Sequence, residues 1–186
     1  MIEKFLKIPK EWLLLNFLLI FVSIIFSYYA GFCWITDSLS NFGVSSDFFN
    51  FSLIVSGLSL GIFTMSVVEK NKFNWWGRMF LMASSIMLTF IGIFTEEYFI
   101  HFIFAVSLFT FFPFGLLFFG ASLKESNRNL AIFTQIVAVI LVLLWMASFV
   151  IWMWFYKIGL AIPEIASLVI WVIWCFVFIV NFRNKK

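Results

Sequence analysis

Charged residues are scarce in this sequence, since Asp, Glu, Lys and Arg together make up only 11% of its 186 residues. A soluble domain carries about 25% of such residues. Apolar residues make up 64%, and they form long runs with almost no charge, a pattern typical of membrane spans. We therefore expect an integral membrane protein, with a single transmembrane domain that occupies residues 1–186.

Residues and motifs that carry known chemistry are equally few. The two cysteines, Cys33 and Cys175, fall at different depths of their spans, so no disulfide is expected. A single histidine cannot build a three-histidine zinc site, and the spacing of the carboxylates around it is not diagnostic of a mixed site. There is no P-loop, dinucleotide fingerprint, Gly-x-Ser-x-Gly elbow or pair of haem ligands. We expect no metal and no cofactor, and the question of enzymatic activity stays open.

Six apolar segments are long enough to cross a bilayer, which takes about 20 residues at a rise of 1.5 Å each. They are apolar at every position and lack the alternation of a β-barrel strand, so the sequence predicts an all-α bundle of six transmembrane helices. The first segment is too long for a signal peptide and is expected to be retained. The expected spans are 11–33, 48–68, 76–94, 99–121, 130–155 and 164–182.

The basic residues predict the orientation of these spans. With the N-terminus inside, the cytoplasmic side receives every Lys and Arg except Lys157, and such a bias sets the topology of short loops. Both termini are therefore expected in the cytoplasm, in a multi-pass protein of the cell membrane. This distribution also accounts for the net charge of +3, so nucleic acid is not an expected partner. The cytoplasmic set is Lys4, Lys7, Lys10, Lys70, Lys72, Arg78, Lys124, Arg128, Arg183, Lys185 and Lys186.

Polar side chains gather on the opposite, outer side. Ionisable residues at membrane depth are costly and often functional, so we expect them to line an outward-facing pocket. Glu97 and His101 are spaced i,i+4, which would place them on one helical face. The candidate pocket residues are Asp37, Ser38, Asn41, Asn50, Glu97, His101 and Glu164.

The same residues have an ordinary structural interpretation. Glu164 follows Pro163, and an acid in the first turn of a helix is favoured by the helix dipole. Asp37 with Ser38 and Ser40 can likewise form a loop or cap cluster. For His101 we expect a partner among Asp37, Asn50 and Glu164, since an unpaired polar group in hydrocarbon is costly. The alternative is a hydrogen bond to a backbone carbonyl or to interface water.

A pair of glycines indicates where two helices meet. Gly57 and Gly61 form a small-x-x-x-small face, which lets backbones approach closely inside a membrane. We expect this face to pack against another helix.

Several of these positions resemble an uncharacterised family of archaeal and bacterial membrane proteins, domain of unknown function 998. The similarity lies in the loop Asp37–Gly43, in Phe49-Asn50 followed by Gly57, in Glu96-Glu97 followed by His101, and in Gly159 and Glu164. That family often has an arginine after the last acid, whereas this chain has Ile165. The loop after the first span is also similar to that of a eukaryotic six-helix family of GPI-anchor remodelling and autophagy-modulator proteins. This looser similarity implies work on lipids.

These observations lead to one functional hypothesis and one alternative. The first is a membrane protein whose outward-facing polar pocket engages a lipid headgroup or a small polar ligand, with membrane lipids as partners. If the protein is an enzyme, His101 and an acid are the expected acid–base pair. The alternative is a non-catalytic accessory subunit that packs against other membrane subunits or against itself. A transporter is disfavoured because no charge lies near the middle of any span.

Overall fold

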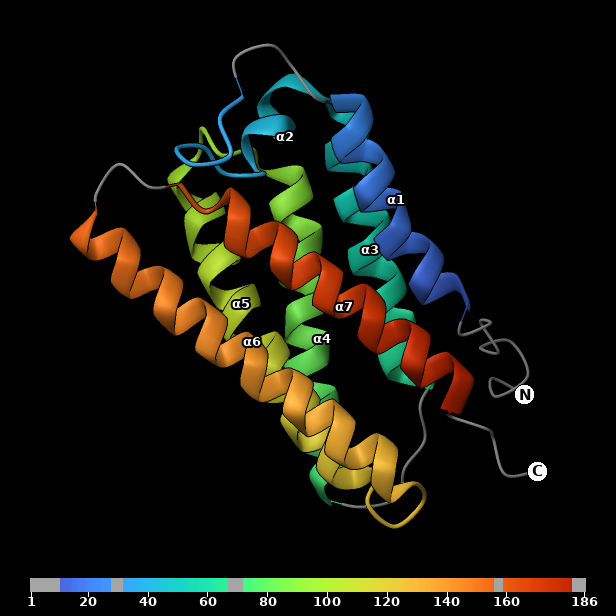
Figure 1. Cartoon of the computed structure of the whole chain (residues 1–186). Coiled ribbons are helices and arrows are strands. Elements are labelled where there is room, and N and C mark those ends of the chain that lie inside the picture. Colours follow the sequence, from blue (N-terminus) through green and yellow to red (C-terminus); the bar gives the residue numbers. More distant parts are fainter. Residues whose placement is uncertain (1–10, 28–31, 67–71, 156–158, 182–186) are drawn as a thin grey trace.

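The computed structural model describes residues 11–27, 32–66, 72–155 and 159–181, and within these ranges it contains helices and no β-strand (Figure 1). The elements are α1 (Glu11–Ser27), α2 (Asn41–Ser45), α3 (Asp47–Ser66), α4 (Lys72–Ile93), α5 (Phe99–Ser122), α6 (Arg128–Trp154) and α7 (Ala161–Asn181). Five of them, α3 to α7, are long and apolar enough to cross a membrane. The helix α1 is a shorter apolar helix of 17 residues. The all-helical membrane bundle is therefore confirmed.

The helix bounds differ modestly from the expected spans. The first helix ends at Ser27, whereas the span was expected to reach residue 33. Residues 28–31 lie outside the described part of the chain. The segment between α1 and α3 contains the short helix α2, which the sequence analysis treated as a loop. A helix of 5 residues forms no long apolar run, so hydropathy cannot detect it.

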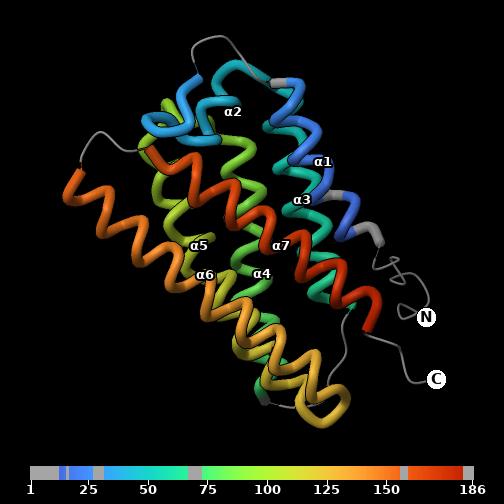
Figure 2. Tube along the Cα trace, in the orientation of Figure 1, coloured from blue at the N-terminus to red at the C-terminus, as the bar shows by residue number. Residues whose placement is uncertain are grey.

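The long helices run antiparallel to their neighbours in sequence, as the trace in Figure 2 shows. In space, α3 packs between α1 and α4, and α5 packs between α4 and α6. The last helix, α7, contacts both α1 and α6 and so closes the bundle. The beginning of α1 and the end of α7 lie at the same end of the molecule, and α2 covers the opposite end (Figure 1).

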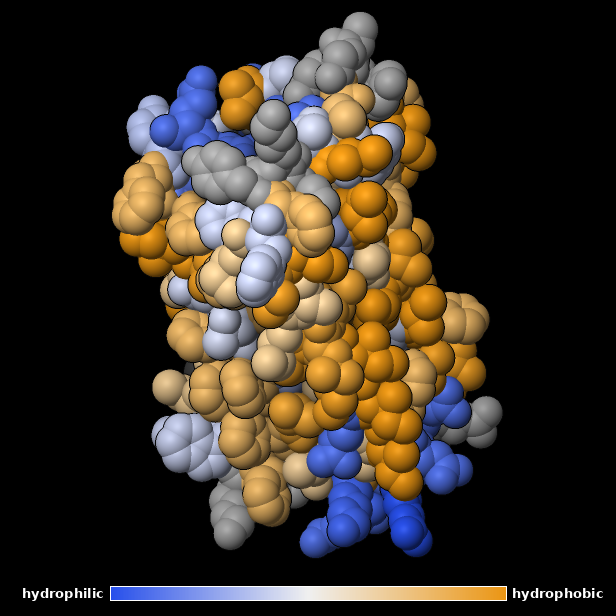
Figure 3. Space-filling view, turned by 60° about the vertical axis from the view of Figure 1, so that its left-hand side comes forward, coloured by the Kyte–Doolittle hydropathy of each residue, from blue (hydrophilic) through white to orange (hydrophobic). Residues whose placement is uncertain are grey.

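The charges separate between these two ends. At the end covered by α2, which we call the acidic end, lie Asp37, Asp47, Glu96, Glu97 and Glu164. The described side chains of Arg78, Lys124 and Arg128 lie at the other end, the basic end, together with Glu125. The remaining basic residues of the orientation argument lie outside the described residues or, like Lys72, have no described side chain. Figure 3 shows an apolar flank between hydrophilic ends.

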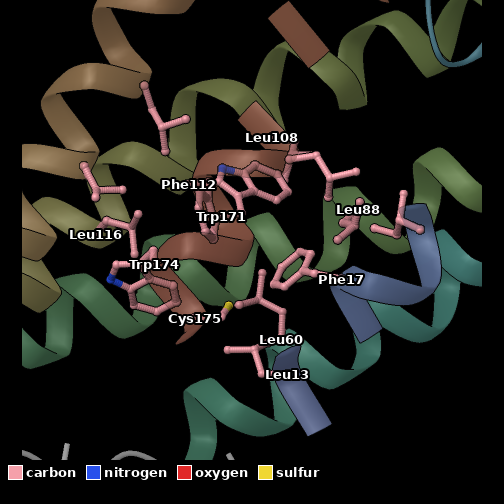
Figure 4. Packing of buried hydrophobic residues seen from close by; sticks show 14 of the residues in the cluster. Leu13, Phe17, Leu60, Leu88, Leu108, Phe112, Leu116, Trp171, Trp174 and Cys175 are labelled. Carbon is pink, nitrogen blue, oxygen red and sulfur yellow. The ribbon is translucent and has the colours of Figure 1, made fainter. Parts of the chain in front are cut away.

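Aromatic side chains fill the centre of the bundle (Figure 4). Trp171 of α7 lies edge-on to Phe17 of α1, with ring centroids 5.4 Å apart, and 4.3 Å from the ring of Phe112 in α5. One turn further along α7, the fully buried Trp174 donates its indole N–H to Thr134 of α6 at 3.2 Å. Aromatic pairs add to the stability beyond their buried area, so this cluster ties α7 to three other helices.

Close helix packing occurs where glycines face a neighbour. A Cβ on Gly57 would lie 2.7 Å from the backbone nitrogen of Thr89, and one on Gly61 would lie 2.6 Å from Ser85 Oγ. Ser85 Oγ also donates to the Gly57 carbonyl at 2.7 Å. The Gly57/Gly61 face therefore lies directly against α4. On the other side of α3, the hydroxyls of Ser52 and Ser23 are 2.9 Å apart and join α3 to α1.

Candidate ligand site

The segment 32–46, here called the cap segment, is held over the acidic end by backbone hydrogen bonds. The Gly159 N–H donates to the Ile35 carbonyl at 2.6 Å, and the Ala161 N–H donates to the Asp37 carbonyl at 3.0 Å. The Asp37 carboxylate points back into its own turn, where it accepts from the Cys33 N–H at 2.9 Å and from the Thr36 hydroxyl at 3.3 Å. Asp37 thus shapes the turn, which agrees with the capping interpretation of this residue.

A second attachment of the cap segment uses the side chain of Glu164. Its Oε2 atom accepts a hydrogen bond from the Leu39 N–H at 2.6 Å, across 125 positions of sequence. This hydrogen bond joins two distant parts of the chain, so Glu164 fixes the middle of the cap segment to α7.

A third attachment reaches the turn between α4 and α5. Ser38 Oγ donates to Glu96 Oε2 at 2.7 Å. With its amide nitrogen turned toward these acceptors, Asn41 donates to Glu96 Oε2 at 2.5 Å and to Ser38 Oγ at 2.7 Å. Two of the candidate residues therefore meet one acid, and this acid is Glu96, which was not among the candidates.

The candidate residue Glu97 has a different place from the one expected. It precedes α5, which begins at Phe99, so the i,i+4 relation to His101 does not put the two on one helical face. Glu97 is exposed and makes no hydrogen bond or ion pair with any residue that the structure describes. Asn50 also turns away from the other candidates: its amide nitrogen donates to the Gly43 carbonyl at 2.7 Å and braces α2 against α3.

His101 is buried, with 5% of its surface exposed, and both ring nitrogens have partners. Nδ1 lies 2.6 Å from the Phe94 carbonyl oxygen, and Nε2 lies 2.9 Å from Ser40 Oγ. A carbonyl oxygen can only accept, so Nδ1 carries the proton. In the neutral ring Nε2 is then the acceptor, and the Ser40 hydroxyl donates to it. One ring nitrogen therefore has the backbone carbonyl partner that was the expected alternative for His101. The other ring nitrogen pairs with a serine.

Beneath the cap segment lies a cavity of about 70 Å³. Helices α1, α3, α4, α5 and α7 supply an apolar wall, which includes Leu53, Leu88, Leu108, Phe109 and Leu168. Three polar side chains also line the cavity: Ser40 of the cap segment, and Glu164 and Ser167 of α7. Of the seven candidate residues, Glu164 is the member of this lining. The other six lie in the hydrogen-bond networks above the cavity or, like Glu97, at the surface.

One donor in the cavity lining has no acceptor. Trp171 lines the cavity and is only 4% exposed, yet its indole nitrogen makes no hydrogen bond with the described residues. Buried polar groups are rarely left without a partner, and this nitrogen is itself enclosed by protein, so it is an unpaired donor of the core beside the cavity.

The side of the cavity between α5 and α7 is covered by α6. Trp145 stacks on Phe109, with ring centroids 3.6 Å apart, and donates its indole N–H to Ser167 Oγ at 2.9 Å. Both partners line the cavity, so Trp145 forms an outer layer of its wall.

Sequence reasoning missed the residues that matter most to this geometry. Ser40 and Ser167 stood at the right depth but were not among the candidates, and Trp171 was hidden because its neighbours are uniformly apolar. No group of three or more His, Cys, Asp or Glu side chains within the described residues is arranged to hold a metal ion.

A family model described as protein of unknown function (DUF998) matches residues 14–181. This match confirms the resemblance that the loop and histidine positions indicated. No curated protein and no solved structure matches the chain.

Proposed function

Since the chain belongs to the DUF998 family, a family of unknown function, we propose a function from its own geometry. The protein is a six-span protein of the cell membrane that binds an amphipathic lipid. The first carbons of one lipid chain occupy the cavity under the cap segment, the rest of the chain lies in the bilayer beside the bundle, and the headgroup lies at the outward-facing acidic end. No catalysis is needed for this role.

The observation that carries this proposal is the composition of the cavity wall. Its wall is mostly apolar, as ligand pockets generally are, and a few polar groups converge on it. Ser40, Glu164 and Ser167 belong to the acidic end, where a headgroup would meet water.

The orientation follows from the basic residues. Five helices can span, and α1 supplies the sixth crossing if the undescribed residues beside it complete the span. An even number of crossings agrees with the position of the start of α1 and the end of α7 at one end of the bundle (Figure 1). The positive-inside bias then assigns the basic end to the cytoplasm.

Native mass spectrometry of the protein, extracted from its own membranes in mild detergent, tests the proposal. The wild-type protein should carry a bound lipid. The Ala105→Leu variant adds bulk to the cavity wall and should lose most of this lipid. Ala147→Leu makes the same change on the exposed face of α6 and should retain it. Equal retention by both variants, or no bound lipid in the wild type, contradicts the proposal.

A second candidate, an accessory subunit of a membrane complex, is favoured by the exposure of α6. Large apolar side chains are exposed along its last three turns, including Met146, Phe149 and Trp154. Lateral contacts with another subunit or a second copy would cover them. Gentle extraction followed by sizing and protein identification separates the two functions: a defined complex with a second polypeptide supports the subunit, and a lipid-bound monomer excludes it.

A further inference from the structure

We propose that Ser40 is a nucleophile activated by His101, and that the protein forms an acyl ester on Ser40 from an ester-linked lipid. This inference rests on the proposed lipid site only for its substrate. The pair itself is defined by hydrogen bonds within the chain. Nucleophilic catalysis requires a nucleophile within hydrogen-bond reach of a base, and a third group that orients the base.

The three required parts are present around His101. Ser40 Oγ and His101 Nε2 are 2.9 Å apart, within the range for proton transfer. The Phe94 carbonyl accepts from Nδ1 at 2.6 Å, which holds the ring and keeps the lone pair on Nε2 directed at the serine. When the ring takes up a proton, the same carbonyl dipole stabilises the imidazolium. The carbonyl therefore has the role that a carboxylate has in a serine–histidine–aspartate triad.

The side chain of Ser40 does not cap the helix that it precedes. It occupies the N-cap position of α2, where a serine normally accepts a hydrogen bond from a backbone N–H of the first turn. Its side chain makes no such capping bond, and it points to His101 instead. Because Ser40 also lines the cavity, the hydroxyl lies between its base and the place proposed for the lipid.

The reaction conserves atoms and protons. Ser40 Oγ attacks the ester carbonyl carbon while its proton passes to His101 Nε2. The bond from that carbon to the leaving oxygen then breaks, and the leaving alcohol takes the proton from Nε2. The acyl group remains on Ser40 until water, or the hydroxyl of a second lipid, attacks it with His101 again as the base. The overall reaction is hydrolysis or acyl transfer.

The substrate class follows from the cavity. An ester of a long acyl chain places the carbons next to its carbonyl against the wall around Leu108 and Leu168, because a cavity of about 70 Å³ holds only a short part of the chain. The ester carbonyl then lies at the polar part of the lining, beside Ser40 and near Glu164 and Ser167. Soluble esters with a short acyl group make fewer contacts with this wall and are poor substrates.

A fluorophosphonate probe with a long alkyl chain tests the proposal on the purified full-length protein in lipid nanodiscs. Phosphonylation should occur at Ser40, as read by mass spectrometry of the labelled peptide in the wild-type protein. Ser40→Ala should abolish labelling. His101→Asn retains an amide donor for the Phe94 carbonyl but removes the base, so the labelling rate should fall at least about 100-fold.

Ser45→Ala is the matched control, because Ser45 is an exposed hydroxyl of the same cap segment that donates to the Phe42 carbonyl in its own turn. It should be labelled at the wild-type rate. An unlabelled wild-type protein, a label at another serine, or an unchanged rate in His101→Asn overturns the proposal. Lipid retention by native mass spectrometry separates the two claims. If the wild-type protein retains lipid but is not labelled, only the proposal of an acyl ester on Ser40 is wrong. If it is labelled at Ser40 but retains no lipid, only the proposed lipid site is wrong.

Discussion

Gly159 lies against the backbone of Asp37, at the point where the cap segment meets the start of α7. A Cβ on Gly159 would lie 2.5 Å from the Asp37 backbone nitrogen and even closer to the Asp37 carbonyl oxygen. The approach is fixed by the hydrogen bonds from Gly159 to Ile35 and from Ala161 to Asp37. This contact gives a structural reason for the glycine before the last helix, one of the positions by which the sequence resembles its family.

Gly159→Ala is therefore expected to destabilise the protein. The added methyl meets backbone atoms, which cannot rotate away, and overpacking of this kind costs about 1–3 kcal/mol. The effect is measured by heating the protein in detergent and recording the temperature at which its monodisperse peak in size-exclusion chromatography is lost. Val44→Ala, at an exposed position of the same cap segment, should leave the unfolding temperature nearly unchanged. An unchanged temperature in Gly159→Ala would mean that this contact is loose.

The two glycines of α3 should differ in their sensitivity to substitution. A methyl on Gly57 meets backbone atoms of α4, at 2.7 Å from Thr89 N and 2.9 Å from Ser85 O. A methyl on Gly61 meets the Ser85 hydroxyl, which can rotate. Gly57→Ala should therefore lower the free energy of unfolding by about 1–3 kcal/mol, and Gly61→Ala should lower it by less. Chemical unfolding in mixed micelles ranks the two, and the opposite order would contradict the packing described here.

The helices were largely predictable from sequence because membrane spans follow from length and polarity alone. The segments around Asp47–Ser66, Phe99–Ser122 and Arg128–Trp154 agree with their expected spans to within two residues. The cap segment was not predictable in the same way. Its conformation depends on contacts with Gly159, Glu164 and Glu96, which come from distant parts of the chain.

The candidate site was only partly accessible for a related reason. Depth in the membrane can be estimated from sequence, so the analysis found the end of the bundle where His101 and Glu164 lie. Depth does not give the direction of a side chain around a helix or within a loop. Asn50 and Glu97 therefore looked equivalent to His101, although the first braces α2 and the second is exposed. The contact between Ser40 and His101 depends on how the cap segment lies over α5, which the sequence does not show.

The contact between Trp145 and Ser167 should contribute measurably to the closure of the cavity. Trp145→Phe keeps an aromatic ring on Phe109 but removes the hydrogen bond to the buried Ser167 hydroxyl. Polar pairs between membrane helices couple by about 0.6 kcal/mol on average and by about 1.7 kcal/mol at most. A double-mutant cycle with Ser167→Ala should give a coupling energy in this range. Strictly additive effects would show that the two side chains act independently.

Cys33 should react with alkylating reagents at a lower pH than an ordinary cysteine. The Thr36 hydroxyl, followed by the backbone N–H groups of Ile35 and Thr36, lowers the pKa of this exposed thiol. The thiolate is the reactive form, so the midpoint of the rate–pH profile should lie below the usual pKa of about 8.5. Iodoacetamide kinetics measure it, and Thr36→Val should move the midpoint up while Thr36→Ser leaves it in place. Cys175 is fully buried and should not react in the folded protein.

The orientation of the bundle can be tested with single cysteines in a Cys33→Ser background. Glu97 is exposed at the acidic end and makes no hydrogen bond or ion pair with the described residues, and Asn129 is exposed at the basic end. The positive-inside bias predicts that a membrane-impermeant maleimide labels Glu97→Cys on intact cells. Asn129→Cys should be labelled only after permeabilisation.

A third position tests the number of crossings separately. If α1 crosses the membrane, Glu3→Cys should behave like Asn129→Cys, because the chain before α1 then lies on the side of the basic end. If α1 does not cross the membrane and does not hold its place in the bundle, the chain before it stays on the side where α3 begins, and Glu3→Cys should be labelled on intact cells together with Glu97→Cys. If only Asn129→Cys were labelled on intact cells, the orientation of the bundle would be the reverse of the one proposed. The cavity under the cap segment would then open toward the cytoplasmic leaflet. The lipid sought in the binding experiment would in that case come from the inner leaflet, with the same contacts to Ser40, Glu164 and Trp171.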